Sequence, residues 1–395
     1  MKICRCIIPL FLLIGLTVSC VQPPADIPNA EVQTFDLLPV NDDHYSIFAI
    51  KSHYNSYYES EDSLIFVHID TSGNMIEQYA MGVPFRPNIR LQYLMPNGNV
   101  LLYGNLDLSY YTAGLWEIDN NARLQRELQL DHYSSAVIPS LDGNIILFGS
   151  SYTEDDIERL PYIKGDLSGD TIWVKELPVH YRHSISAGIP LSDNGFLALG
   201  NVRTENGDTD MFAARADADG DTLWTGTYGG ENYDKLYLAE ELSDGSFLMA
   251  GELNVTDTTN PDWRLSSGQQ IYLINVSANG EKEWSRAVGT TLRERPNALL
   301  ECSDGNYILL GTREESYAYI FDETVGWISK IDRQGNTLWQ TEFNSIIPSA
   351  VRELPSGVLL ISATGLIDNY KYASEMHLIK LSSSGTVLMN KALTP

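Results

Sequence analysis

Residues 238–251 read LAEELSDGSFLMAG, an apolar run, the turn Asp244-Gly245 and a second apolar run that ends in glycine. That order is typical of a β-hairpin. After a loop rich in Thr, Asn, Asp and Pro, residues 271–284 read IYLINVSANGEKEW and predict a second hairpin, which turns at Asn279-Gly280. Two hairpins make four strands, so this stretch predicts one four-stranded unit.

The rest of the chain repeats this unit. The two hairpin types alternate strictly from Val32 to Pro395 and divide the chain into seven units of about 52 residues, close to the repeat length of known propellers. The first type turns at Asp42-Asp43, Asn97-Gly98, Asp142-Gly143, Asn194-Gly195, Asp244-Gly245, Asp304-Gly305 and Ser356-Gly357. The second type turns at Ser72-Gly73, Asn120-Asn121, Ser168-Gly169, Asp219-Gly220, Asn279-Gly280, Gln334-Gly335 and Ser384-Gly385.

The composition of the strands separates a propeller from a β-sandwich, a β-helix or a row of separate domains. Residues 145–148 (IILF), 307–310 (YILL) and 358–361 (VLLI) are apolar throughout, whereas a sheet with one wet face would alternate. The inner strands of a propeller are covered on both sides by neighbouring blades. The sequence therefore predicts an all-β fold, a seven-bladed β-propeller of four-stranded antiparallel blades, over residues 32–395.

One unit also carries a family resemblance. Residues 304–312 (DGNYILLGT), followed by residues 331–339 (IDRQGNTLW), resemble the repeat of bacterial β-propeller lipoproteins. The repeat is distantly similar to quinoprotein-dehydrogenase-like propellers and to the propeller lipoprotein of the outer-membrane barrel-assembly machinery. The resemblance covers residues 32–395 and implies a fold rather than an activity. The last of these relatives implies that such a molecule can be purely a scaffold.

The N-terminus predicts a lipoprotein signal peptide over residues 1–19. A positive start and an apolar stretch precede residues 16–20 (LTVSC), which resemble a lipobox that ends at Cys20. The resemblance implies that Cys20 is acylated, with palmitate among its chains, and that residues 20–31 tether the propeller to a membrane. Secretion without lipidation is the alternative. The expected location is the cell envelope, with the periplasmic side favoured over the cell surface.

Cysteine content and charge exclude two further classes. Only Cys302 remains in the mature chain besides Cys20, so no intramolecular disulfide is expected. The formal net charge of the whole chain is −26. Because binding to a phosphate backbone needs basic clusters, nucleic acid is not an expected partner.

Several residues are candidates for chemistry but have a simpler structural interpretation. Tryptophans recur four residues after the second turn and are expected to pack against the adjacent blade, although a sugar-binding set is the alternative. Residues 217–221 (DADGD) start like a calcium loop but lack its later Gly and Glu, and Asp217 is expected to cap its own turn. The recurring position holds Trp173, Trp224, Trp284 and Trp339, with Glu77, Gln125 and Met389 in the other units.

Other cofactor and catalytic motifs are not found. Cys302 replaces core residues of other units and is expected to be a buried hydrophobe. His180 and His183 lie between strands without a third ligand nearby in sequence, so no metal site is expected. No phosphate loop, nucleophile elbow or adjacent-cysteine pair occurs, and no cofactor is expected. Dispersed carboxylates leave a lyase or glycosidase pair open.

The two faces of the predicted propeller differ. Alternating strand direction places the fourteen short turns on one face, and the longer connections with the blade-to-blade crossings on the other, which we name the turn face and the loop face. Loops on a rigid scaffold often bind partners, and Tyr and Arg supply contact area with a polar tip. The candidate binding residues are Tyr57, Tyr58, Tyr110, Tyr111, Tyr152, Arg182, Tyr233, Trp263, Arg293, Arg295, Tyr317, Tyr319 and Tyr370.

These observations favour a membrane-anchored, non-enzymatic binding or scaffold module that presents its loop face to a glycan, peptide or membrane-protein partner. The alternative is a polysaccharide-acting enzyme, a lyase or glycosidase, with carboxylates at the axial mouth. An enzyme needs two or three ionisable groups that converge there, whereas a scaffold does not.

Overall fold

The computed structural model describes residues 30–41, 43–54, 60–82, 88–95, 97–105, 113–130, 135–149, 160–177, 183–205, 207–230, 233–256, 267–290, 292–315, 323–366 and 374–393. These residues form 28 strands and no helix. Accordingly, no helix that could cross a bilayer is found in the described ranges. The all-β class predicted from the hairpin repeat is confirmed.

The strands pair in chain order into antiparallel sheets of four. The first sheet contains β1 (Ala30–Asn41), β2 (His44–Tyr54), β3 (Ser60–Asp70) and β4 (Met75–Gly82). The second contains β5 (Asn88–Leu94), β6 (Val100–Asn105), β7 (Ala113–Ile118) and β8 (Leu124–Leu130). The third contains β9 (Ala136–Pro139), β10 (Ile145–Phe148), β11 (Leu160–Gly165) and β12 (Thr171–Leu177).

The fourth sheet contains β13 (His183–Pro190), β14 (Phe196–Arg203), β15 (Thr209–Ala216) and β16 (Thr222–Tyr228). The last contains β25 (Ile346–Glu353), β26 (Leu359–Leu366), β27 (Ser374–Leu381) and β28 (Val387–Leu393). Between these two lies a sheet of eight strands: β17 (Lys235–Glu241), β18 (Phe247–Thr256), β19 (Ser267–Val276), β20 (Lys282–Val288), β21 (Arg293–Glu301), β22 (Tyr307–Glu315), β23 (Glu323–Ile331) and β24 (Thr337–Asn344).

The hydrogen bonding thus divides the described strands into six sheets, where the repeat predicted seven blades. In the eight-stranded sheet, β17 to β20 and β21 to β24 each pair antiparallel in the same way as the four-stranded sheets. One parallel bridge, Gln269 with Arg293, joins the two sets. The fifth and sixth units are therefore merged by a single backbone contact near the loop face.

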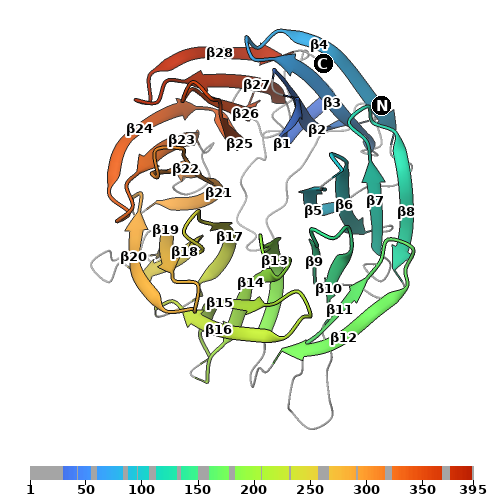
Figure 1. Ribbon diagram of the computed structural model, residues 1–395. Coiled ribbons are helices and arrows are strands. Elements are labelled where there is room, and N and C mark those ends of the chain that lie inside the picture. The colour runs from blue at the N-terminus through green and yellow to red at the C-terminus, as the bar shows by residue number, and fades with distance from the viewer. Residues whose placement is uncertain are drawn as a thin grey trace, which may run out of the picture.

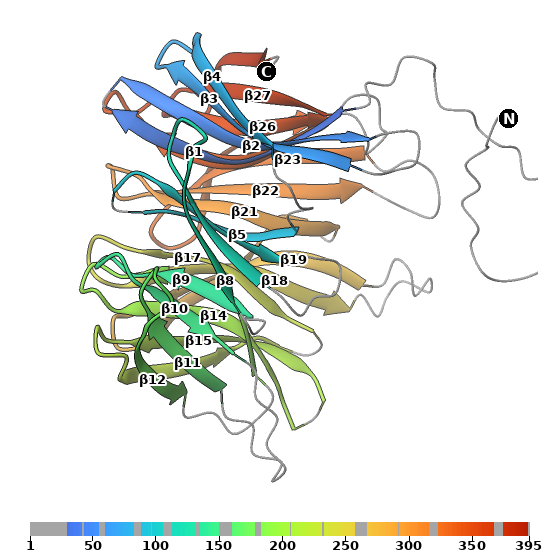
Figure 2. The same ribbon diagram turned by 90° about the vertical axis from the view of Figure 1, so that its right-hand side faces the viewer.

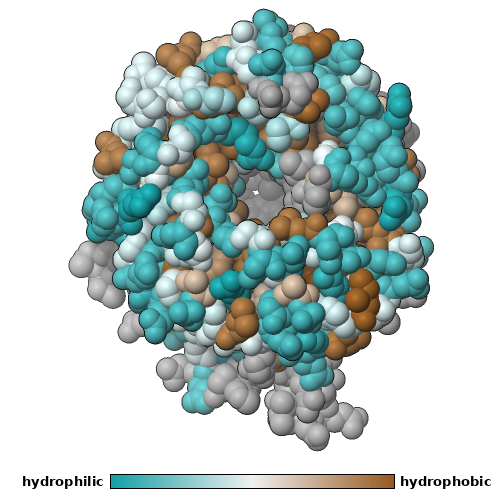
Figure 3. Space-filling view, in the orientation of Figure 1, coloured by the Kyte–Doolittle hydropathy of each residue, from teal (hydrophilic) through white to brown (hydrophobic). Residues whose placement is uncertain are grey.

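The sheets are arranged in a ring, and the first strand of each unit lies innermost around a central opening (Figure 1). A hollow is visible at the centre of the same view in space-filling form (Figure 3). Seen from the side, the turn face and the loop face lie at opposite ends of the strands (Figure 2). The loop-face ends of the inner strands therefore surround the axial mouth, which lies on the face where binding residues were predicted.

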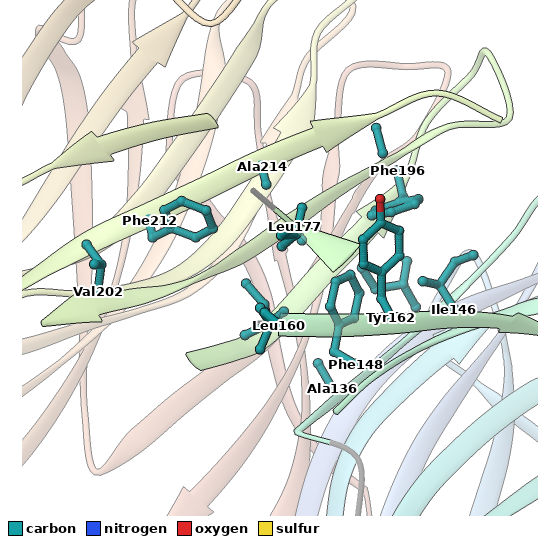
Figure 4. Close-up of a cluster of buried hydrophobic side chains, with 14 residues drawn as sticks. Ala136, Ile146, Phe148, Leu160, Tyr162, Leu177, Phe196, Val202, Phe212 and Ala214 are labelled. Atoms are coloured by element: carbon teal, nitrogen blue, oxygen red, sulfur yellow. The ribbon is translucent and has the colours of Figure 1, made fainter. Parts of the chain in front are cut away.

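The core lies between neighbouring sheets rather than in one central block. Phe148 and Tyr162 of one sheet stack with ring centroids 5.5 Å apart, and both rings contact Phe196 of the next sheet. Figure 4 shows this cluster, which also includes Phe212 and Leu177. Each sheet is thus apolar on both faces, which explains why the inner strands carry unbroken apolar runs.

The recurring tryptophans pack against the adjacent unit, as predicted. A Cβ added to Gly280 would lie 2.6 Å from the ring of Trp224, whose Nε1–H donates to the Ala278 carbonyl at 3.0 Å. The same relation joins Trp173 to Gly220, Trp284 to Gly335 and Trp339 to Gly385. Two turns lie one residue from their predicted places. Ala122, with φ of 58°, takes the glycine position of one turn, so Arg126 rather than Gln125 holds the tryptophan position. Asn194, with φ of 65°, takes the glycine position in the turn predicted at Asn194-Gly195.

The ring closes by packing of the last sheet against the first. Met389 covers Gly73, where a Cβ would lie 2.6 Å from the Met389 methyl carbon. The Val32 N–H donates to Ser374 Oγ at 2.7 Å. Every described sheet is built from consecutive strands, so within these residues the ring closes without a strand exchanged between the termini.

Candidate functional site

Two neighbouring crossings at the axial mouth share one construction. The first runs from β16 to β17 and the second from β20 to β21. Each begins with a glycine of positive φ, Gly229 or Gly289, and has a carboxylate, Asp234 or Glu294, five residues later. A Cβ on either glycine would collide with that carboxylate, so the close approach requires glycine at both positions.

The two carboxylates hold their crossings closed, and we name them the crossing latches. Asp234 is fully buried; its Oδ2 accepts the Gly230 N–H at 2.8 Å and its Oδ1 accepts the Asn254 N–H at 2.9 Å. Glu294 is 1% exposed, and its Oε2 accepts the Thr290 N–H at 2.8 Å. Each latch thereby ties the start of its crossing to the strand that follows.

Burial sets the ionisation of the latches. It raises the pKa of Glu294 to about 7, with the hydrogen bonds from Thr290 acting in the opposite direction. Burial also raises the pKa of Asp234, against the hydrogen bonds from Asn254 and Gly230. The cost of dehydrating a carboxylate therefore exceeds the gain from its hydrogen bonds at both crossings.

A second aspartate lies beside the first latch. One point, the Cβ position of Gly229, is 2.6 Å from Asp234 Oδ2 and 2.9 Å from Asp210 Oδ1. Burial, then Asp234, then Asp208 raise the pKa of Asp210. Within the described residues Asp210 Oδ1 is buried without a hydrogen-bond partner. Two neighbouring aspartates with raised pKa values therefore lie at the first crossing.

The residues on either side of each latch face solvent. Tyr233 and Lys235 flank Asp234, and the Tyr233 side chain is 60% exposed. Arg293 and Arg295 flank Glu294, with side chains 57% and 56% exposed. Because side chains alternate along a strand, burying the latch places both neighbours on the outside. Each crossing thus presents a cationic side chain at the mouth.

One of these cations is joined to two other strands. Glu252 on β18 is 2% exposed; its Oε1 lies 3.0 Å from Arg295 Nε, and its Oε2 accepts the Tyr237 hydroxyl at 3.0 Å. Tyr237 is the extra residue of a β-bulge between Leu236 and Leu238 on β17, and bulges redirect side chains. Burial and then the Glu252 charge raise the pKa of Tyr237. The phenol therefore stays protonated and donates to Glu252.

Further ion pairs surround the second crossing. Arg313 Nη1 lies 3.0 Å from Glu342 Oε1, and Arg293 Nη1 lies 3.6 Å from Glu314 Oε2. No group of three or more His, Cys, Asp or Glu side chains in the described ranges is placed to hold a metal ion. The arginines at the second crossing are each paired with a glutamate.

The structural interpretations of two other candidates are confirmed. Asp217 Oδ1 accepts the N–H groups of Asp219 at 3.0 Å and Asp221 at 2.8 Å, so it caps its own turn. Cys302 is buried, and its burial raises the pKa of the thiol to about 12, which disfavours the thiolate nucleophile.

Three of the predicted binding residues are described, and all three lie at the two latched crossings: Tyr233, Arg293 and Arg295. The other predictions lie outside the described residues: Cys20, Tyr57, Tyr58, Tyr110, Tyr111, Tyr152, Arg182, Trp263, Tyr317, Tyr319 and Tyr370, as does His180. Sequence reasoning missed Asp234, Tyr237, Glu252 and Glu294. The spacing of glycine and carboxylate in two successive crossings is the signal that could have identified the latches.

No protein-family model and no curated protein sequence matches this chain. Among solved structures, it is similar to puromycin hydrolase, with a TM-score of 0.51 and 13% identity over 92% of this chain and 54% of that one. The chain thus spans about half the length of that enzyme. It is also similar to the polysaccharide lyase Uly1, with a TM-score of 0.51 and 11% identity over 88% of this chain and 90% of that one. At such identities the likeness shows a shared propeller-like fold alone.

Proposed function

We propose that this chain is a membrane-anchored, non-enzymatic binding module that takes up a glycan at the axial mouth of its loop face. The observation that carries this proposal is the pair of latched crossings, in which a buried carboxylate fixes the backbone and the flanking side chains remain exposed. A rigid backbone that presents Tyr233, Arg293 and Arg295 lowers the ordering cost of binding.

The proposal includes seven blades. The contact of Trp284 with Gly335 relates the two halves of the eight-stranded sheet as the other tryptophans relate separate sheets. The single bridge between Gln269 and Arg293 is the exception to this pattern. Counting β17 to β20 and β21 to β24 as two blades gives seven units of the same construction.

The membrane anchor is a proposal from the N-terminal sequence. The lipobox-like residues 16–20 support acylation of Cys20, and the proline-containing segment that follows supports a tether. The envelope location, with the periplasmic side favoured, has the same support.

A glycan array tests the binding proposal. The full chain in detergent is compared with the double variant Tyr233→Ala, Arg293→Gln and with the control Lys282→Gln, Arg286→Gln on the outer strand β20. We expect glycan binding to be lost in the loop-face variant and kept in the control. Equal losses in both variants, or no binding by the unaltered chain, would contradict the proposal.

An enzyme that cleaves polysaccharide is the second candidate, because Tyr237, Glu252 and Arg295 converge at the mouth. Catalysis by proton abstraction needs a base that ionises near the working pH. The raised pKa of Tyr237 works against that role, so the same three residues fit binding better. Release of oligosaccharides by the purified chain, abolished in Glu252→Gln, would establish the enzyme instead.

A further inference from the structure

We propose that Arg295 is the anion-binding centre of the axial mouth and that it takes the carboxylate of a uronic-acid residue in a glycan chain. This inference rests on the proposed glycan binding by the loop face and assigns the class of sugar to it.

Arg295 is already ion-paired in the absence of a ligand. Its Nε lies 3.0 Å from the buried Oε1 of Glu252, which accepts no hydrogen bond within the described residues, and the Arg295 side chain is 56% exposed. The Nη edge of a guanidinium is a planar fork that binds a carboxylate through two parallel hydrogen bonds.

Glu252 is itself fixed. Its other oxygen accepts the Tyr237 hydroxyl at 3.0 Å, and only 2% of its side chain is exposed. The three residues come from β17, β18 and β21, so the ion pair joins two neighbouring units. The buried charge of Glu252 attracts Arg295 to the boundary between these units.

The charges around Arg295 select a singly charged group. The exposed side chains beside it, Lys235 and Arg293, are cationic. Glu252 and the latches Asp234 and Glu294 are buried at the same two crossings, and Glu314 pairs with Arg293. These carboxylates oppose a dense negative charge at the mouth. A carboxylate carries one charge, whereas a phosphate monoester carries nearly two at neutral pH. The carboxylate therefore fits this balance better than a phosphate monoester does, and the titration below distinguishes it from a sulfate ester, which also carries one charge.

The overall charge of −26 does not prevent this contact. At physiological salt, charges farther apart than about 8 Å are largely screened, so distant surface carboxylates weigh little against a direct ion pair. The side chain of Tyr233, 60% exposed on the adjacent crossing, offers an aromatic face for a sugar ring. Together these features favour a polymer of acidic sugars over an isolated anion.

Calorimetric titration of the full chain in detergent tests the inference. The probes are hexagalacturonate, a neutral glucose hexasaccharide and a sulfated hexasaccharide of the same length. We expect hexagalacturonate to bind most tightly. In Arg295→Gln its dissociation constant should rise about tenfold or more, because a charge-assisted hydrogen-bonded contact is lost. In Arg295→Lys, which keeps the charge but lacks the fork, it should rise about threefold or more.

Arg286→Gln on the outer strand β20 is the matched control and should change the constant by less than about twofold, since its side chain bonds Asn336 away from the mouth. Thermal melting of each variant confirms that it is folded; if Arg295→Gln does not fold, the Arg295→Lys result decides. Tightest binding of the sulfated or neutral sugar would overturn the inference, as would unchanged binding of hexagalacturonate by the Arg295 variants. Loop-face binding would then still stand if the Tyr233→Ala, Arg293→Gln variant loses its glycan, whereas no binding of any glycan overturns both.

Discussion

Arg295 Nε lies 3.0 Å from Glu252 Oε1, an ion pair between β21 and β18, in which one partner is more than half exposed and the other is almost fully buried. The pair crosses the boundary between two units that pair separately except for one bridge. The buried partner has its second oxygen occupied by the Tyr237 hydroxyl. Stability of the boundary and presentation of the arginine at the mouth therefore depend on the same three side chains.

Tyr237→Phe should lower the free energy of unfolding by roughly 1–2 kcal/mol. The substitution removes the hydroxyl that donates to Glu252 Oε2 and leaves that buried oxygen without this donor. Urea denaturation at pH 7 measures the change. Tyr272→Phe is a suitable comparison, because its hydroxyl bonds Ser285 at a partly buried site and its loss should cost less. A larger effect of the Tyr272 change would contradict the assigned role of Glu252.

The repeat made the strands, the turns and the packing of the tryptophans predictable from sequence. These features depend on neighbours a few residues apart, or on a position that recurs in every unit, such as Trp224 and Trp284. The turn at Asn120-Asn121 was misplaced by one residue because Ala122 replaces the usual glycine in the left-handed region. Local sequence patterns were therefore sufficient to predict most of the strands and turns.

The candidate site could not be assembled from sequence in the same way. Tyr237, Glu252 and Arg295 are brought together by a bulge and by packing between units, and neither leaves a short motif. In the sequence Asp234 cannot be told from a surface carboxylate. In the structure its side chain is fully buried and accepts the backbone N–H groups of Gly230 and Asn254. Burial and long-range contact, rather than residue type, distinguish these carboxylates from the rest.

Stability should fall as the pH rises from about 5 to above 7, in part because of Glu294. Its pKa rises from an ordinary value of 4.5 to about 7 on folding. The folded state therefore keeps a proton that the unfolded state releases in this window, and the linked loss is roughly 1–3 kcal/mol. Glu240, whose pKa burial also raises to about 7, contributes in the same direction.

Glu294→Gln should reduce the slope with which the free energy of unfolding falls as the pH rises, because the glutamine side chain has no proton to release. Chemical denaturation at pH 5, 6, 7 and 8 gives the slope for each variant. The control is Glu283→Gln, the same change of charge at an exposed position on β20, and it should leave the slope nearly unchanged. A parallel slope in Glu294→Gln would mean that Glu294 ionises at its ordinary pKa.

Cys20→Ala should move the protein from the membrane fraction to the soluble fraction. Without the thiol no acyl chain can be attached, and the burial of about 0.8 kcal/mol per CH₂ is lost. Ultracentrifugation of broken cells, followed by detection in pellet and supernatant, gives the result. A soluble unaltered protein would show that the lipobox prediction is wrong, and pelleting of the variant would point to another attachment.

Gly280→Ala should destabilise the protein more than Gly245→Ala, although both glycines belong to turns of the same unit. Their φ angles are +84° and +82°, so each substitution carries the same left-handed penalty of roughly 1–2 kcal/mol. A Cβ at Gly245 meets nothing within 4 Å, whereas at Gly280 it would lie 2.6 Å from the Trp224 ring. Displacing that ring should add roughly 1–3 kcal/mol. Equal shifts in urea denaturation would show that the tryptophan contact between units contributes little to stability.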